Sequence, residues 1–311
     1  MVLAPVRTPT RSAGSALERR TYTALVLAQC LIVFTGGLVR LTGSGLGCPT
    51  WPDCVHGSLT PVRHQAQGIH SAVEFGNRLL TFVLLIVVVA SVVVAMRRRP
   101  RRAPLVWLAW GGVLGVLAQA VLGGITVRTH LNPLSVAAHF LLSMALIAVA
   151  VALQQRAQDG GDDPPRAAVR RELLVAGRAL VPLAAAVLAV GTLVTGSGPH
   201  AGDEHTHRLH LDPRTLAWLH ADLVMLLVGL TVATWLGLRV TDAPWRAQRR
   251  LLVLLGVIAA QGAIGYTQYF TGVPAWLVAL HIAGACAVWV ATLRVPYVLR
   301  TRGPSAAASG A

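Results

Sequence analysis

The sequence predicts an all-α polytopic membrane protein of eight transmembrane helices, arranged as two repeated four-helix bundles with both termini in the cytoplasm. Hydrophobic residues make up 54% of the 311-residue chain, and charged residues make up 13%. Apolar runs of about 20 residues recur, and each is long enough to cross roughly 30 Å of hydrocarbon. Motifs of the first half of the chain return in the second half. The predicted spans cover residues 22–39, 68–95, 104–127, 135–154, 173–195, 216–238, 251–270 and 275–298.

The placement of arginine predicts the orientation. The formal net charge is +15, and because the chain has no lysine, arginine supplies the positive charge. With the N-terminus in the cytoplasm, the cytoplasmic connections carry 21 arginines and the outer connections carry five. This asymmetry follows the positive-inside rule for a multi-pass membrane protein. The basic excess therefore indicates topology, and no nucleic-acid partner is expected.

The spans and connections divide the chain into five parts. No signal-peptide cleavage pattern follows the polar N-terminal tail, so the first span is expected to be retained. The connection between the halves is rich in Gly, Asp and Pro and is predicted to be a flexible linker. The parts are the tail at 1–21, the N-terminal half at 22–155, the linker at 156–172, the C-terminal half at 173–300 and a cytoplasmic tail at 301–311.

The internal repeat is visible in short motifs. LVRLTGSG at 38–45 ends the first span, and LVTGSG at 193–198 ends the fifth. GGIT precedes His139 in the first half, as AIGYT precedes His281 in the second. The halves are offset by about 142 residues, and both have the same orientation because four spans return the chain to the same side.

Three histidines lie at one predicted depth in the membrane. His139, His220 and His281 each stand five to seven residues inside the outer end of an even-numbered span, about 8–10 Å deep at 1.5 Å per residue. In the second half, His220 and His281 come from different helices, as the two axial ligands of one haem iron would. The alternative is that each imidazole hydrogen-bonds to a neighbouring helix. Because the three occur together, we expect haem binding.

A charged face begins the second span. His70, Glu74 and Arg78 follow one another at four-residue spacing and so share one face of a helix. A charge in hydrocarbon costs at least about 2–3 kcal/mol, so it is usually paired and functional. One interpretation is a structural ion pair between Glu74 and Arg78. The other is that Glu74 accepts a proton or stabilises positive charge during a reaction, while Arg78 keeps it ionised.

The outer loop at 42–67 carries two cysteines. Cys48 and Cys54 lie on the oxidising side of the membrane and are expected to form a disulfide. Whether that disulfide is a structural staple or a redox-active pair stays open, and a zinc site is the weaker alternative.

The outer loop of the second half carries four histidines, and two interpretations of them are open. They bind a transition-metal ion, or their side chains face water. The four histidines are His200, His205, His207 and His210.

Six motifs together resemble the haem A synthase family over all eight predicted spans. The resemblance implies oxidation of the C8 methyl group of haem O to a formyl group, which makes haem A for cytochrome c oxidase. It implies haem b as the cofactor of the C-terminal half and haem O as the substrate of the N-terminal half. It also implies haem O synthase and the oxidase assembly machinery as partners, beside membrane lipid, with a homo-oligomer left open. The motifs are GGLVRLTGSGLGCPTWPDC, VEFGNRLLT, GGITVRTHLNPLSVAAHF, VTGSGPHAGD, LHADL and GVPAWLVALH.

The resemblance assigns roles residue by residue. His220 and His281 match the axial ligands of haem b, and His139 matches the histidine of the substrate half. Glu74 matches the acid of the family's Glu-x-x-His-Arg motif. Cys48 and Cys54 match the family's loop pair.

One position departs from the family motif, because this chain reads EFGNR with Asn77 in place of histidine. The substrate iron is then bound by His139 alone, or His70, two helical turns away, replaces the missing ligand. A third interpretation is that haem O is held through its porphyrin edge and propionates. Arg40 and Arg128 are the candidates for propionate binding, with lipid headgroups as their alternative partners.

Two other functions fit part of the pattern. A membrane cytochrome b that carries electrons from quinol would explain the paired histidines of the second half. A haem or lipid carrier would explain a repeated bundle. Neither explains Glu74, the difference between Asn77 and His220, or a cysteine loop in one half only.

Overall fold

The computed structural model describes residues 14–159, 161–203 and 206–302. Eight of its helices are long and apolar enough to cross a membrane, which confirms the predicted class and number of spans. The parts of the predicted tails at 1–13 and 303–311 lie outside the described residues. The helices are α1 (Ala16–Leu41), α2 (Ile69–Arg97), α3 (Ala103–Arg128), α4 (Pro133–Gln158), α5 (Arg171–Ser197), α6 (Pro213–Val240), α7 (Trp245–Phe270) and α8 (Ala275–Val298).

Local capping sets where several helices begin. Ser15 and Glu18 form a reciprocal capping box, so α1 starts six residues before the predicted span. Asn132 and Asp212 cap α4 and α6, and in both helices proline occupies the first turn, where its missing N–H costs nothing. The helices therefore extend past the apolar runs that predicted them.

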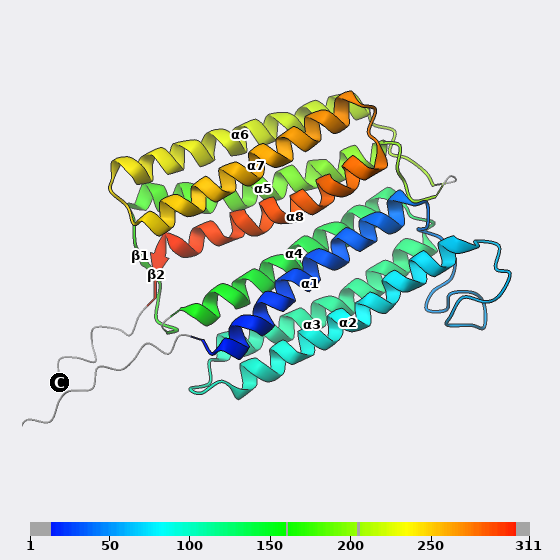
Figure 1. The fold of residues 1–311 in the computed structure, drawn as a ribbon, viewed down its shortest axis with the longest axis horizontal. Helices are drawn as coiled ribbons and strands as arrows, with labels where there is room; N and C mark the ends of the chain where they lie inside the picture. The colour runs from blue at the N-terminus through cyan, green and yellow to red at the C-terminus, as the bar shows by residue number, and fades with distance from the viewer. Residues whose placement is uncertain (1–13, 160, 204–205, 303–311) are drawn as a thin grey trace, which may run out of the picture.

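The helices form two bundles, α1–α4 and α5–α8, which lie side by side in Figure 1. Helices α1 and α4 meet α5 and α8 between the bundles, while α2, α3, α6 and α7 lie at the periphery. The indole Nε1 of Trp289 donates to the Met144 carbonyl across this junction at 2.8 Å. The contact of α1 with α8 has its counterpart in the contact of α4 with α5, as expected for two repeats of the same orientation.

The packed core lies toward one end of the bundles. We call the end that carries residues 42–68 the loop face, and the opposite end, where α1 starts and α8 finishes, the terminal face (Figure 1). In α6, burial begins at Leu227 and continues toward the terminal face; in α7 it ends at Ile258, coming from the terminal face. Within these fully described helices, the turns near the loop face contain no buried residue.

The terminal face is held together by ion pairs. Glu18 of α1 pairs with Arg98 after α2 at 2.6 Å, and both side chains are buried. Arg102 pairs with Asp162 at 2.7 Å, and this hydrogen bond lowers the pKa of Asp162. These contacts join helices and connections that are far apart in the sequence.

The connection between the bundles pairs with the segment that follows α8. Its short strand β1 (Arg166–Ala167) lies antiparallel to β2 (Arg300–Thr301), which follows α8. Arg102 also donates to the carbonyls of Arg156 and Gly161. The sequence predicted a flexible linker at 156–172, whereas the described part of this connection is held by strand pairing and by arginine contacts.

Candidate functional site

Four side chains near the loop face share one packing arrangement. Each comes from an even-numbered helix and lies over a glycine of the helix that precedes it. A Cβ atom built on that glycine would lie 3.1–3.2 Å from an imidazole Cε1 in three cases, and 3.9 Å from an amide nitrogen in the fourth. We call these the glycine-backed positions: His139 over Gly123, His220 over Gly191, His281 over Gly265 and Asn77 over Gly36.

The two imidazoles of the C-terminal half face each other. The ring centroids of His220 and His281 are 6.4 Å apart, with 56° between the ring planes. Two imidazole nitrogens that share one metal ion at about 2 Å each place their ring centroids roughly 6 Å apart. The structure therefore brings this predicted pair to the separation that a shared iron requires.

Glutamines support the same positions in both halves. Gln119 Nε2 donates to the His139 carbonyl at 2.9 Å, and Gln261 Nε2 donates to the His281 carbonyl at 2.8 Å. Each glutamine precedes its histidine by 20 residues. The sequence analysis missed both, although the equal spacing was a readable signal of the repeat.

Fewer residues are buried at the level of the glycine-backed positions than near the terminal face. In α4 no residue before Ser143 is buried, and α5 has no buried residue between Ala184 and Gly196, both stretches being fully described. The Nδ1 atoms of His139 and His281 are buried without a hydrogen-bond partner in the described chain. These two histidines therefore lie in the part of the helices with fewer buried residues, and each keeps a buried ring nitrogen that no described protein group satisfies.

The donor set indicates which kind of metal group would fit. In the described part of the chain, no group of three or more His, Cys, Asp and Glu side chains is placed to hold a metal ion. A bare ion of the zinc type takes three or four such ligands. An iron porphyrin brings four equatorial nitrogens of its own and needs only axial imidazoles. The residues present therefore fit a haem.

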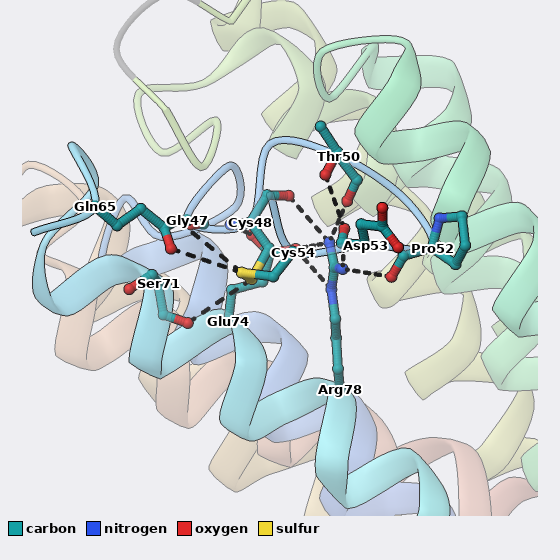
Figure 2. Close-up of polar contacts among 10 residues, drawn as sticks. All are labelled: Gly47, Cys48, Thr50, Pro52, Asp53, Cys54, Gln65, Ser71, Glu74 and Arg78. Atoms are coloured by element: carbon teal, nitrogen blue, oxygen red, sulfur yellow. Dashed lines mark hydrogen bonds and ion pairs between the residues drawn. A yellow bond between two sulfur atoms is a disulfide. The ribbon is translucent and has the colours of Figure 1, made fainter. Parts of the chain in front are cut away.

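Glu74 and Arg78 anchor the cysteine loop (Figure 2). The Glu74 carboxylate is buried; its Oε1 pairs with Arg78 Nη2 at 2.7 Å, and its Oε2 accepts the backbone N–H of Cys48 at 2.7 Å. Arg78 also donates to the carbonyls of Cys48 at 3.0 Å and Thr50 at 3.1 Å. The ion pair expected from the spacing is present, and Arg78 binds loop carbonyls that lie 28 and 30 residues earlier in the sequence.

The cysteine loop closes over the N-terminal half. Cys48 and Cys54 form the expected disulfide, and both side chains are 0% exposed. Trp51, between them, lies against Gly124 of α3, where a Cβ atom would meet the indole ring at 2.5 Å. Gly124 is the neighbour of Gly123, which backs His139. The loop therefore packs directly beside the glycine-backed position of His139.

His70 belongs to the same loop contacts. His70 lies in the first turn of α2, and its Nδ1 is 2.8 Å from the hydroxyl oxygen of Ser44 in the loop. Asn77 follows seven residues later, about 10 Å farther along the helix. The structure thus places His70 closer to the loop face than the glycine-backed position of Asn77.

The two predicted propionate-binding arginines differ. Arg40 Nη2 donates to the Thr195 carbonyl of α5 at 2.8 Å, and its Nε is buried without a partner in the described chain. Arg128 is exposed at the end of α3. Arg208, which the sequence analysis did not select, lies near enough to Arg40 for their charges to repel, and burial lowers the pKa of Arg208.

The loop of the C-terminal half gives no support to a separate metal site. His200 Nε2 lies 2.8 Å from the Val273 carbonyl oxygen. His207 and His210 are exposed. His205 lies outside the described residues.

Comparison with known proteins identifies a family. The family model COX15-CtaA, described as cytochrome oxidase assembly protein, matches residues 19–293. Proteins named Heme A synthase from Geobacillus thermodenitrificans and Geobacillus kaustophilus are 33% and 37% identical to the chain over 126 residues, which is 40% of this chain and 38% of each relative. The protein named Heme A synthase from Methylobacterium nodulans is 27% identical over 313 residues, covering 83% of this chain and 84% of that relative.

Proposed function

The chain belongs to the COX15-CtaA family of cytochrome oxidase assembly proteins, and we propose that it is a haem A synthase. In this proposal, a multi-pass protein of the plasma membrane oxidises the C8 methyl group of haem O to a formyl group. The product is haem A for cytochrome c oxidase. Haem O comes from a haem O synthase, and haem A passes to the oxidase assembly machinery.

The facing histidines carry the proposal for the C-terminal half. His220 and His281, at 6.4 Å between ring centroids, would hold haem b from both sides. A bound haem b supplies a one-electron redox centre without an open axial position, which suits electron transfer. Gln261 fixes the backbone of His281 through its carbonyl, so the imidazole keeps its direction.

The N-terminal half is the proposed substrate site. His139 would hold the substrate iron, and the cysteine loop with Trp51 covers this side of the bundle. A cover that excludes water strengthens every electrostatic interaction beneath it. Arg40, at the junction of the halves, is the proposed partner for a propionate, because its buried Nε has no partner in the described chain.

Glu74 is the proposed catalytic residue. Converting a methyl group to a formyl group removes electrons and protons, so a carboxylate near the reacting carbon can accept a proton or stabilise positive charge. Both Glu74 oxygens already accept hydrogen bonds, from Arg78 and from Cys48. We therefore favour the electrostatic role, in which Arg78 and the loop hold a negative charge in a fixed place.

Pigment analysis tests this function. The chain is expressed with a haem O source in a host that lacks haem A, and the extracted haems are separated by chromatography. We expect haem A, and we expect a His139→Ala variant to yield haem b without haem A. Haem b alone from the wild-type chain would instead identify a membrane cytochrome b, and the absence of pigment would favour a carrier.

A further inference from the structure

Asn77 stands where the repeat otherwise places a histidine. The three imidazoles come within 3.1–3.2 Å of the Cβ site on their backing glycines, whereas the nearest Asn77 atom is 3.9 Å from that site on Gly36. The C-terminal counterpart of Asn77 is His220, whose ring faces His281. The N-terminal half therefore offers one imidazole, His139, where the C-terminal half offers two.

Asn77 is not a substitute ligand. Iron in porphyrins takes imidazole, thiolate, thioether or phenolate ligands, and a side-chain amide has no basic nitrogen. The amide is nonetheless buried in part, and its Oδ1 atom has no hydrogen-bond partner in the described chain. Since a buried polar group without a partner is costly, its position points to a partner that the protein does not supply.

The other polar side chains of the same helix are already bound elsewhere. His70 contacts the Ser44 hydroxyl group two turns nearer the loop face. Glu74 and Arg78 bind each other and the backbone of the cysteine loop. Glu74 and Arg78 are therefore not free to take the axial place opposite His139, and His70 lies about 10 Å along α2 from the glycine-backed position of Asn77.

We propose that the N-terminal half holds its porphyrin iron through His139 alone, and that Asn77 lines the opposite, open axial side as a binding position for water or a small diatomic molecule. The inference rests on the proposed function only in taking an iron porphyrin as the ligand of this half. A side-chain amide suits the position because its NH₂ group donates and its carbonyl accepts, so that it pairs with either kind of ligand. The duplicated fold thus contains one closed and one open iron site.

Carbon monoxide distinguishes the two sites, because it binds ferrous haem only where an axial position is open. The purified full-length chain is titrated with ferrous haem b, and its carbon monoxide difference spectrum is recorded. We expect two haems per chain, one of which binds carbon monoxide. Asn77→His supplies the missing imidazole and is expected to lower carbon monoxide binding about tenfold or more while adding a second low-spin spectrum.

Two further variants sharpen the result. His220→Asn copies the N-terminal arrangement into the C-terminal half and is expected to make its haem bind carbon monoxide. Asn77→Leu keeps the open position but removes the amide, so carbon monoxide still binds and its C–O stretching frequency shifts.

Several results would overturn the inference. These are a wild-type chain that binds one haem, two haems that are both insensitive to carbon monoxide, and carbon monoxide binding that survives Asn77→His. If carbon monoxide binds only after His70→Ala, then His70 is the ligand. The readout does not depend on haem A formation, so a chain that makes haem A with a closed N-terminal site would reject this inference and leave the proposed function intact.

Discussion

The loop-face ends of the two halves are built on one backbone plan and carry different chemistry. In the C-terminal half, His220 and His281 face each other across 6.4 Å. In the N-terminal half, the equivalent positions hold Asn77 and His139, and a buried ion pair anchors a disulfide-closed loop above them. The comparison teaches that the repeat sets the backbone positions and the depth of these side chains, whereas substitutions at a few of the positions give the two halves different chemistry.

The largest expected effect is the loss of bound haem b when one of the facing histidines is removed. His281→Ala is expected to reduce haem b in the purified protein about tenfold or more, because even residues that only support a metal ligand typically cost that much affinity. Bound haem per protein is measured by absorbance after extraction into pyridine. His207→Ala, in the exposed loop, is the control and should retain full haem content. Equal haem in both variants would contradict the pairing.

The next largest effect is expected on haem A output, when the ion pair of Glu74 and Arg78 is broken. Glu74→Gln keeps the shape of the side chain and removes its charge, so haem A output should fall about 100-fold. The matched control is Glu18→Gln, which breaks the other buried glutamate–arginine pair, at the terminal face. Both variants lose stability, by up to about 3–5 kcal/mol for a buried pair. If the two variants lost haem A output equally, Glu74 would have only a structural role.

Removing the disulfide should have a smaller effect, which lowers the free energy of unfolding and leaves the C-terminal half unchanged. Replacing Cys48 and Cys54 by serine releases a closed loop with a sequence separation of six. By loop-closure entropy this is expected to cost about 2 kcal/mol of unfolding free energy. Thermal unfolding measures it, and a reductant should lower the wild-type midpoint without changing that of the double variant. The haem b spectrum should stay unchanged; a changed spectrum would show that the loop also shapes the C-terminal site.

The smallest expected effect is a shift in the haem b absorption or reduction potential, and it tests the glycine at a glycine-backed position. A Cβ atom at Gly265 would lie 3.1 Å from His281 Cε1, whereas one at Gly262, a turn earlier in α7, meets no atom within 4 Å. Gly265→Ala is therefore expected to tilt the imidazole and shift the haem b absorption or its reduction potential slightly. Gly262→Ala should leave both at the wild-type values. Identical spectra for the two variants would show that Gly265 does not set the orientation of His281.

Much of this arrangement could be predicted from periodicity and residue type. Span length and apolar content predicted the eight helices, and the i,i+4 spacing predicted the ion pair of Glu74 and Arg78. The oxidising side predicted the disulfide. The site roles of the histidines stay predictions, although their placement over glycines agrees with them.

Contacts between distant segments could not be predicted in this way. Arg78 binds carbonyls of the cysteine loop, and Gln119 and Gln261 bind histidine carbonyls on the next helix. Nothing in the local pattern around these residues specifies the partner, because a side chain's neighbours on another helix depend on packing. The early start of α1 was missed for a different reason, since its capping box lies outside the apolar run.

The strand pair at the terminal face bears on how the chain is made. Because β2 follows α8, its partner β1 is synthesised four helices earlier and can pair only after α8 has been made. The strand pair can therefore hold the connection between the bundles only after α8 has been synthesised. The pairing of β1 with β2 therefore requires a completed α8, and removal of residues 300–301 would remove this contact with the connection between the bundles.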